Sequence, residues 1–191
     1  NLSLANNYVE NLPFNLKKLH NLTSLCLVKN KFLALPDSLG DLRGLTDFWA
    51  DYNQIETLPG YLKDLKELTL LSLGSNQLSY LPDFVGKFQK LTYLSLGENN
   101  LKELPDSLGD LRALTKLDLH KNELKILPDS LGNLEALTDL YLSNNKLETV
   151  PDSLGNLQGL IRLSLDNNEL RSIPKCLYQL QNLSYLNLKG N

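Results

Sequence analysis

Nine asparagines recur at intervals of 23 residues along the whole chain, and this spacing constrains the fold more than any local feature. Each asparagine belongs to the same phrase of apolar and variable residues, of which LDLHKNEL at 117–124 is a clean copy. A fixed period of this length predicts a solenoid, in which every repeat is one coil that contacts only its neighbours. The nine positions are Asn7, Asn30, Asn53, Asn76, Asn99, Asn122, Asn145, Asn168 and Asn191.

All eight prolines keep the same register, six residues after each of the first eight asparagines. The combined pattern is L-x-x-L-x-L-x-x-N-x-L followed by L-P-x-x-L-x-x-L. Over the whole chain it resembles the 23-residue class of the leucine-rich repeat family. The phrase Pro-Asp-Ser-Leu-Gly, at 36–40, 105–109, 128–132 and 151–155, is similar to the cytoplasmic scaffold type of this family. That type includes Ras-pathway scaffolds, polarity scaffolds, plant relatives and many bacterial proteins.

The resemblance implies an α/β fold, a leucine-rich repeat solenoid in the shape of a right-handed horseshoe. Its parallel β-sheet is expected on the concave face and its short helical or 3-10 turns on the convex face. We expect a single domain over residues 1–191, with about eight 23-residue repeats and partial repeats at the ends. The chain has no methionine and starts and stops inside a repeat, so we expect it to be a segment of a longer protein.

The leucine pattern predicts the same architecture on physical grounds. Position 1 of a repeat is the leucine that stands eight residues before its asparagine. Positions 4 and 6 then alternate like a short strand with one buried face, as Leu117 and Leu119 do. No single repeat can bury so many leucines alone, so the coils must stack into one core with a parallel sheet along one side. Positions 11, 14, 18 and 21 add more leucines, which in one repeat are Leu101, Leu104, Leu108 and Leu111.

The asparagine at position 9 lies where the chain leaves the strand, and we predict a structural role for all nine. A buried amide there can donate to and accept from backbone groups of its own coil and of the next coil. The opposite side of each coil is predicted to be one short helical turn that holds proline in its first turn. An aspartate places a negative charge near the start of five of these turns, at Asp37, Asp83, Asp106, Asp129 and Asp152.

Composition and charge argue against several classes of partner. The net charge is −3 and the pI is near 5.4, so a basic stripe for nucleic acid or a membrane surface is not expected. No apolar run approaches the roughly 18 residues needed for membrane insertion. Cys26 and Cys176 fall at different repeat positions, so we expect no disulfide between them. Because cysteine-rich end caps are also absent, the chain is expected to be cytoplasmic, or a secreted bacterial effector acting in a host cytosol, rather than extracellular.

Function is predicted on the outer side of the sheet, where positions 3, 5, 7 and 8 point away from the core. Apolar and aromatic residues gather there over four adjacent strands of the N-terminal half, around Trp49, the only tryptophan. An exposed tryptophan flanked by carboxylates is the best hot-spot candidate. We therefore predict a protein partner on the concave sheet face. The predicted contact residues are Cys26, Val28, Asp47, Trp49, Asp51, Tyr52, Leu70, Tyr93 and Tyr141.

Three features of this face allow a second interpretation. Trp49 could instead cover a thin part of the core, because Phe48 and Ala50 replace the usual leucines beside it. A charged zone around Tyr141 could be a polar rim that adds specificity, or an ordinary solvated surface. A stretch of small residues could let a partner's backbone approach closely, or could be neutral variation among repeats. These residues are Ser72, Gly74, Ser75, Ser95 and Gly97.

The sequence holds no arrangement typical of an enzyme. His120 lies four strands from Cys26, about 19 Å at ~4.8 Å per strand, which is too far for a Cys–His pair. Asp118 and His120 share a strand face, but no nucleophile with an orienting third group accompanies them, and one histidine with scattered carboxylates is a poor zinc site. We predict a recognition or scaffold module with no catalysis, metal, cofactor or small-molecule substrate. The alternatives are the targeting domain of a larger kinase, GTPase or bacterial ubiquitin ligase, and a structural or adhesive repeat protein.

Overall fold

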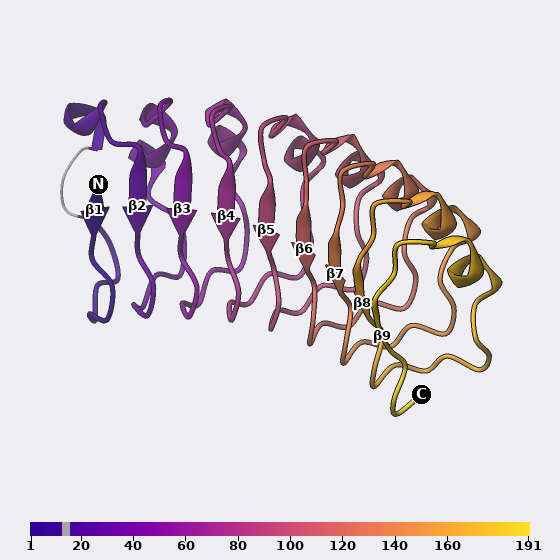
Figure 1. Ribbon diagram of the computed structural model, residues 1–191. Helices are drawn as coiled ribbons and strands as arrows, with labels where there is room; N and C mark the ends of the chain where they lie inside the picture. Colours follow the sequence, from indigo (N-terminus) through magenta and orange to yellow (C-terminus); the bar gives the residue numbers. More distant parts are fainter. Residues whose placement is uncertain (13–15) are drawn as a thin grey trace.

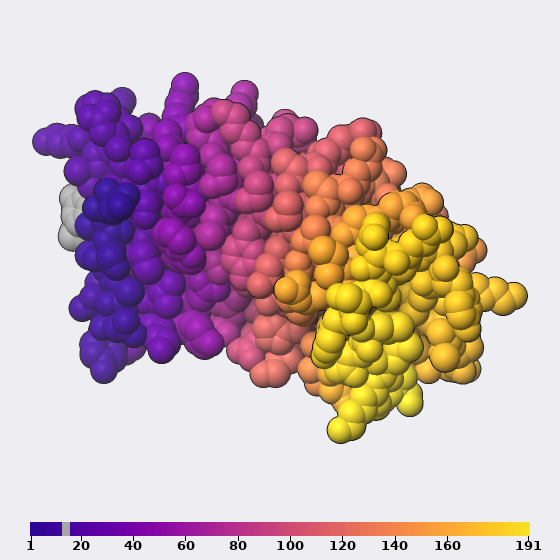
Figure 2. Space-filling view, in the orientation of Figure 1, coloured from indigo at the N-terminus to yellow at the C-terminus, as the bar shows by residue number. Residues whose placement is uncertain are grey.

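The computed structural model describes residues 1–12 and 16–191, which form repeated coils stacked one after another (Figure 1). Each coil contributes one strand to a parallel sheet, and the strand order is the order along the chain. Each strand residue pairs with the residue one repeat later, as Phe48 does with Leu71. In the space-filling view the coils follow in sequence order from one end to the other (Figure 2). The strands are β1 (Leu2–Ser3), β2 (Ser24–Cys26), β3 (Asp47–Trp49), β4 (Leu70–Ser72), β5 (Tyr93–Ser95), β6 (Lys116–Asp118), β7 (Asp139–Tyr141), β8 (Arg162–Ser164) and β9 (Tyr185–Asn187).

Short 3-10 helices form a second layer beside the sheet, which confirms the predicted solenoid (Figure 1). The expectation that proline lies inside the first helical turn is wrong. Pro36 has φ −68° and ψ 137° and immediately precedes a helix, where its carbonyl accepts a hydrogen bond of 2.9 Å from Leu39 N–H. The ring restricts φ but permits this extended cap, and Pro13 lies outside the described residues. The helices are η1 (Leu16–Leu19), η2 (Asp37–Asp41), η3 (Gly60–Asp64), η4 (Asp83–Lys87), η5 (Asp106–Asp110), η6 (Asp129–Asn133), η7 (Asp152–Asn156) and η8 (Lys175–Gln179).

One continuous apolar core fills the space between the sheet and the helices. Positions 4 and 6 are buried from β2 to β8, as the alternation predicts, and Leu117 and Leu119 are both 0% exposed. The third repeat obeys the same rule, because Phe48 and Ala50 are fully buried as well. Burying one such large apolar side chain contributes about 1.5–3 kcal/mol. The stacking of many coils, rather than any one coil, therefore stabilises the array.

Glycine allows close approach of the helices in the middle of the array. A Cβ on Gly132 would lie 2.3 Å from the carbonyl oxygen of Ser153 in the next coil, so only glycine fits there. The equivalent distances for Gly86 and Gly109 are 2.4 and 2.2 Å. We call residues 83–156 the regular region, because each of its coils packs on the next through this glycine–serine contact. Residues 37–82 are the irregular region, in which the positions equivalent to this glycine and serine do not form the glycine–serine contact.

Seven of the nine asparagines are buried, and each links its coil to a neighbour. Asn99 Nδ2 donates a hydrogen bond of 3.0 Å to the Leu73 carbonyl, and its Oδ1 accepts one of 2.9 Å from Leu78 N–H. Both partners lie in the preceding coil, so the expectation of bonds to the next coil is wrong. The reason is that the Asn99 backbone N–H already donates to Lys121 O of the next coil, which leaves the side chain to face the coil before.

Two further repeated features were not predicted. The first is a threonine ladder at position 2, in which Thr115 Oγ1 donates a hydrogen bond of 2.9 Å to the Thr92 carbonyl of the preceding coil. Its signal was readable, since threonine recurs every 23 residues from Thr23 to Thr138. The second is a left-handed backbone at position 8 in all nine coils, which includes Tyr52 at φ 56°. Asparagine or glycine occupies four of these nine positions, and these are the residues that tolerate this conformation best.

Candidate partner-binding face

The register of the sheet places the predicted apolar residues on adjacent strands of its outer face. Asp47, Leu70 and Tyr93 are successive partners on β3, β4 and β5. Cys26 and Trp49 are partners on β2 and β3. All five side chains are half-buried rather than buried, so part of each faces solvent. We call Cys26, Trp49, Leu70 and Tyr93 the Trp49 cluster, and Asp47 lies beside it.

The remaining predicted contact residues lie around this cluster. Val28 is half-buried and follows β2 at position 7. Tyr52 is 54% exposed, and the Lys29 ammonium lies 5.5 Å from the centroid of its ring. Tyr141 lies on β7, two strands beyond the last strand of the Trp49 cluster, so the structure does not bring it into this group.

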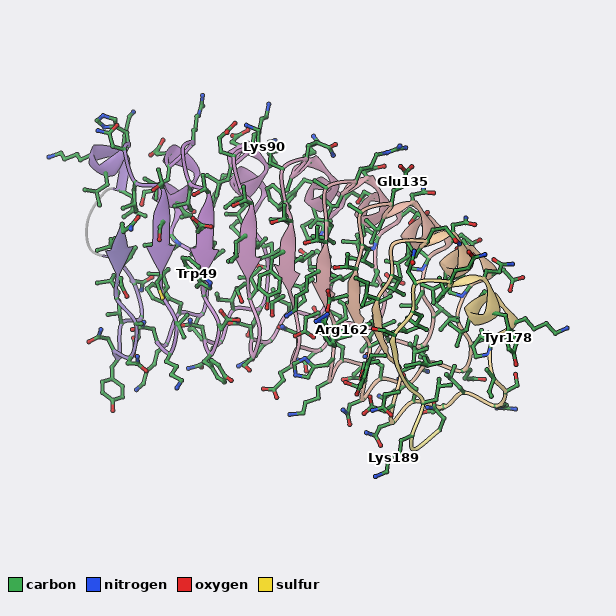
Figure 3. The ribbon with its side chains drawn as sticks, viewed as in Figure 1. Trp49, Lys90, Glu135, Arg162, Tyr178 and Lys189 are labelled. Atoms are coloured by element: carbon green, nitrogen blue, oxygen red, sulfur yellow. The ribbon has the colours of Figure 1, made fainter. Side chains whose placement is uncertain are left out.

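Trp49 points away from the core. Its neighbours Phe48 and Ala50 are 0% exposed, and successive side chains of a strand point to opposite faces of a sheet. The Trp49 ring therefore cannot fill space beneath Ala50, and Phe48 occupies the core at this level. The complete burial of both neighbours favours the binding interpretation of Trp49 over the packing one. Figure 3 shows Trp49 on β3, well separated along the sheet from Arg162 on β8.

Asp47 and Asp51 lie on either side of Trp49, and neutral donors orient both carboxylates. Asp47 Oδ2 accepts a hydrogen bond of 2.8 Å from Thr46 Oγ1. Asp51 Oδ1 accepts one of 2.7 Å from Ser72 Oγ. Neither carboxylate has a cationic ion-pair partner among the residues that the structure describes. The two negative charges are thus held in place but not neutralised.

Side chains of neighbouring coils cover parts of the stretch of small residues. Gly74 N–H donates a hydrogen bond of 2.9 Å to Asp51 Oδ1, so the Asp51 side chain lies across one part of it. A Cβ on Gly97 would lie 2.2 Å from His120 Nδ1, so the imidazole packs directly on Gly97. The Ser95 side chain is only 7% exposed. These glycines make room for side chains of other coils, which a pattern within one repeat does not reveal.

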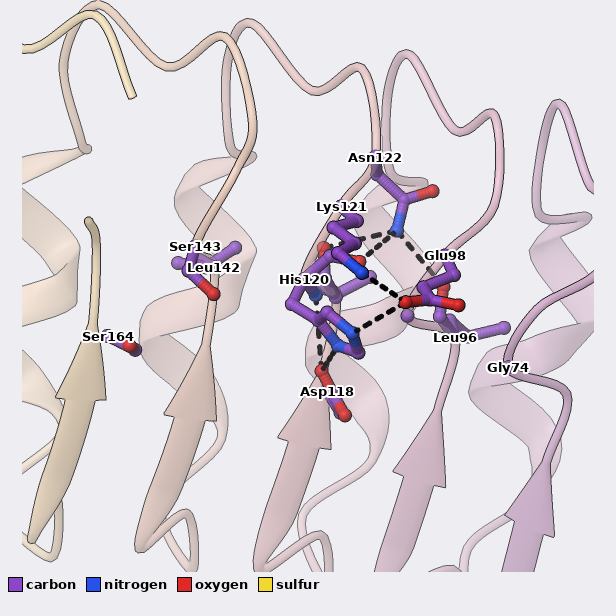
Figure 4. A network of polar contacts seen from close by, with 12 residues as sticks. Gly74, Leu96, Glu98, Asp118, His120, Lys121, Asn122, Leu142, Ser143 and Ser164 are labelled. Carbon is purple, nitrogen blue, oxygen red and sulfur yellow. Dashed lines mark hydrogen bonds and ion pairs between the residues drawn. The ribbon is translucent and has the colours of Figure 1, made fainter. Parts of the chain in front are cut away.

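A polar network crosses the face between β4 and β6 (Figure 4). Asp118 Oδ1 lies 2.7 Å from His120 Nδ1, and Glu98 Oε1 lies 3.8 Å from His120 Nε2. Glu98 also pairs with Lys121, and its Oε2 accepts a hydrogen bond of 2.7 Å from Ser75 Oγ. The hydrogen bond from Lys121, followed by that from Ser75, lowers the pKa of Glu98. The network links three successive coils and satisfies most of its charges internally.

Beyond this network, Lys116 lies between two tyrosine rings. Its Nζ is 5.3 Å from the Tyr93 centroid and 5.2 Å from the Tyr141 centroid, within the range of a cation–π interaction. Burial raises the pKa of both phenols, and the hydrogen bond from Tyr141 to Asp139 adds to the rise for Tyr141. Arg162 Nη1 lies 3.1 Å from Asp139 Oδ1. The charged C-terminal zone is therefore an ordered set of contacts between neighbouring coils.

The described residues do not assemble a catalytic or metal site on this face. Asp118 holds His120 through Nδ1, but the group that faces Nε2 is the Glu98 carboxylate rather than a hydroxyl or thiol nucleophile. No group of three or more His, Cys, Asp or Glu side chains in residues 1–12 and 16–191 could hold a metal ion. Cys26 and Cys176 are free thiols. None of the described helices has the length and apolar character to cross a membrane.

Known proteins share this architecture. A family model for a leucine-rich repeat region matches residues 75–191, and a search of curated proteins gave no match. A leucine-rich repeat protein of Leptospira interrogans has a TM-score of 0.96 at 33% identity, over 99% of this chain and 48% of that one. For an internalin of Listeria monocytogenes the TM-score is 0.79 at 27% identity, over 90% and 49%. The Arabidopsis receptor kinase HAESA, in complex with the peptide hormone IDA and the co-receptor SERK1, gives 0.84 at 31% identity, over 97% and 33%. The chain thus spans less than half the length of each of these three proteins.

Proposed function

Because the chain belongs to the leucine-rich repeat family, we propose that it is a recognition module that binds a protein partner on the concave sheet face, around Trp49. Repeats of this family commonly serve as protein-interaction modules. The similar structure of HAESA contains a peptide hormone and a protein co-receptor, which supports a peptide or protein as the class of partner. Membership of the family does not say where the partner binds, so we infer the site from the residues of the face.

One observation carries this placement. The Trp49 cluster joins aromatic and aliphatic side chains on neighbouring strands, and two oriented carboxylates without cationic partners stand beside its tryptophan. Tryptophan and tyrosine supply large contact areas at little entropic cost, and a central aromatic anchor typically contributes at least ~2 kcal/mol to an interface. Asp47 and Asp51 favour a partner that offers lysine or arginine around an apolar centre, so its association should slow as salt rises.

The test begins with affinity capture from the source organism, which identifies a partner for purification. Calorimetric titration then compares the wild type with Trp49→Ala and Leu70→Ala. Each should weaken binding at least about tenfold, or roughly 1.4 kcal/mol. Tyr185→Ala is the matched control, because Tyr185 is a 49% exposed aromatic residue on β9, six strands from β3.

Arg162→Ala, on β8, should also have little effect on affinity. Thermal melts of all variants separate loss of binding from loss of folding. If Arg162→Ala or Tyr141→Ala weakens binding most while Trp49→Ala has no effect, the site lies in the C-terminal half and the proposal is wrong.

A second candidate is that this chain is the recognition part of a larger catalytic protein. It is favoured by the comparison with HAESA, a receptor kinase of which the chain covers only 33%. The full-length gene decides between the two: a kinase, GTPase or ubiquitin ligase domain beside these repeats would make partner binding a targeting step. We propose a cytoplasmic location in either case, which the two free thiols suit. Cell fractionation of the full-length protein tests it.

A further inference from the structure

Lys116 is a cation with an unusual set of neighbours. Two tyrosine rings, on β5 and β7, hold its ammonium at 5.3 and 5.2 Å from their centroids, and the lysine is half-buried on β6 between them. Within the described part of the chain it forms no ion pair with a carboxylate. The rings therefore restrict the side chain to one place on the outer face without neutralising its charge.

The carboxylates nearest to Lys116 in the register are already engaged. Asp118, on the same strand, accepts hydrogen bonds from the ring and from the backbone N–H of His120. Asp139, its partner on β7, accepts from Tyr141 OH and Thr138 Oγ1 and pairs with Arg162. Because both acids are held by other donors, Lys116 retains capacity to donate to an anion that comes from outside the chain.

The opposite situation exists on β3, where Asp47 and Asp51 are carboxylates without a cation. From β3 to β6 the distance is three strand spacings, about 14 Å at ~4.8 Å each. We infer that Lys116 is a second binding group of the same face and takes a carboxylate of the partner. The partner thus lies along the sheet with a basic side chain at Trp49 and an acidic side chain at Lys116. This inference rests on the proposed function. It adds the charge order of the partner, by which we mean a basic side chain at Trp49 followed by an acidic one at Lys116.

The charge order can be tested with short synthetic peptides before any partner is known. In an extended peptide, two side chains about 14 Å apart are about four residues apart at ~3.3 Å per residue. Three capped peptides share an apolar sequence without aromatic residues and differ only at two positions with this spacing. These positions hold Arg and Glu, Arg and Arg, or Glu and Glu. Because Trp49 is the only tryptophan, its fluorescence reports binding directly.

The wild type should bind the Arg/Glu peptide about threefold to fivefold more tightly than either of the others, as one exposed ion pair permits. Lys116→Glu should reverse this preference in favour of the Arg/Arg peptide. Lys189→Glu makes the same change of charge at an exposed lysine in the last coil and should keep the wild-type preference.

The possible failures are distinguishable. Equal affinity for the three peptides, with binding that is lost in Trp49→Ala, overturns the charge order but leaves the Trp49 site standing. The same reversal in Lys189→Glu shows that only net charge matters and also overturns the inference. If no peptide changes the Trp49 fluorescence at millimolar concentration, the face does not recognise an extended charged segment and the inference fails, while calorimetry with the captured partner still decides the proposed function.

Discussion

The regular and irregular regions contain the same coil but place their sequence variation differently. In the regular region, residues 83–156, glycine of one helix packs on serine of the next, with Gly109 and Gly132 as examples. In the irregular region, residues 37–82, Gly40 instead packs against the Tyr61 side chain, and the next coil has Lys63 where the coils of the regular region have glycine. The Tyr61 hydroxyl donates a hydrogen bond of 2.6 Å to the Leu35 carbonyl, and burial raises its pKa to about 12.

The irregular region is also where the sheet face departs most from its polar pattern. Its strand β3 carries Trp49 on the outer face, and the following strand begins with Leu70. The stacking of the coils does not depend on these side chains, because the core positions stay buried and the asparagine bonds continue through both regions. Stacking therefore requires only a few positions per repeat, so the outer face of the irregular coils can vary without loss of the fold.

The largest change in the free energy of unfolding is expected from a glycine-to-alanine substitution, made once in each region. Gly132→Ala should destabilise the protein by about 3 kcal/mol, because the added Cβ meets backbone of the next coil and forces the helices apart. Gly60→Ala is the matched control, since nothing lies within 4 Å of a Cβ at Gly60. That variant should gain about 0.5 kcal/mol from reduced entropy of the unfolded chain. Urea unfolding measures both, and equal values would show that the added Cβ at Gly132 does not push the helices apart.

The asparagine ladder should be equally necessary in both regions and dispensable at the open end. Asn99→Ala leaves the buried Leu78 N–H without its partner and removes one of the two amide hydrogen bonds to the Leu73 carbonyl, so a loss of about 2 kcal/mol is expected. Asn7→Ala should cost much less, because Asn7 is exposed and its amide bonds only to carbonyls of its own coil. Thermal melts check the pair. An Asn99→Ala variant as stable as the wild type would contradict the ladder argument.

A smaller loss is expected when a leucine is restored to the irregular core. Ala50 is fully buried beside the larger Phe48, which already fills this level of the core. Ala50→Leu should therefore overpack it and destabilise the protein by about 1.5 kcal/mol. Chemical denaturation measures the change. A stabilising effect would show instead that the irregular core contains unfilled space.

The smallest expected change is a gain in stability, from a substitution in the regular region. Ser130 Oγ is buried and has no hydrogen-bond partner, as in Ser107 and Ser153. Ser130→Ala keeps the Cβ and removes an unsatisfied hydroxyl, so it should stabilise the protein by about 1 kcal/mol. The exposed residue Ser79 offers a control, because Ser79→Ala removes a hydroxyl that water already satisfies. Calorimetric melts of both variants suffice, and a destabilised Ser130→Ala would reveal a partner for the hydroxyl.

Much of the architecture was readable from the residues, because the repeat period determines the register. The asparagine spacing alone predicted that Cys26 pairs with Trp49, and that Asp47, Leu70 and Tyr93 are neighbours. The assignment of buried and outer positions followed from alternation along each strand. The direction of the asparagine bonds did not, because it depends on which neighbour the backbone N–H groups already engage.

The coil, its repeat and the neighbours of each strand residue are all encoded in the amino-acid pattern, since they follow from local geometry that recurs every 23 residues. The direction in which the outer side chains turn depends instead on contacts between coils. Asp51 covers Gly74, His120 covers Gly97, and Lys116 lies between two tyrosines. Each of these side chains has several rotamers open to it in an isolated strand. The side chains of the adjacent coils determine which rotamer is adopted. The pattern within a single repeat therefore does not predict it.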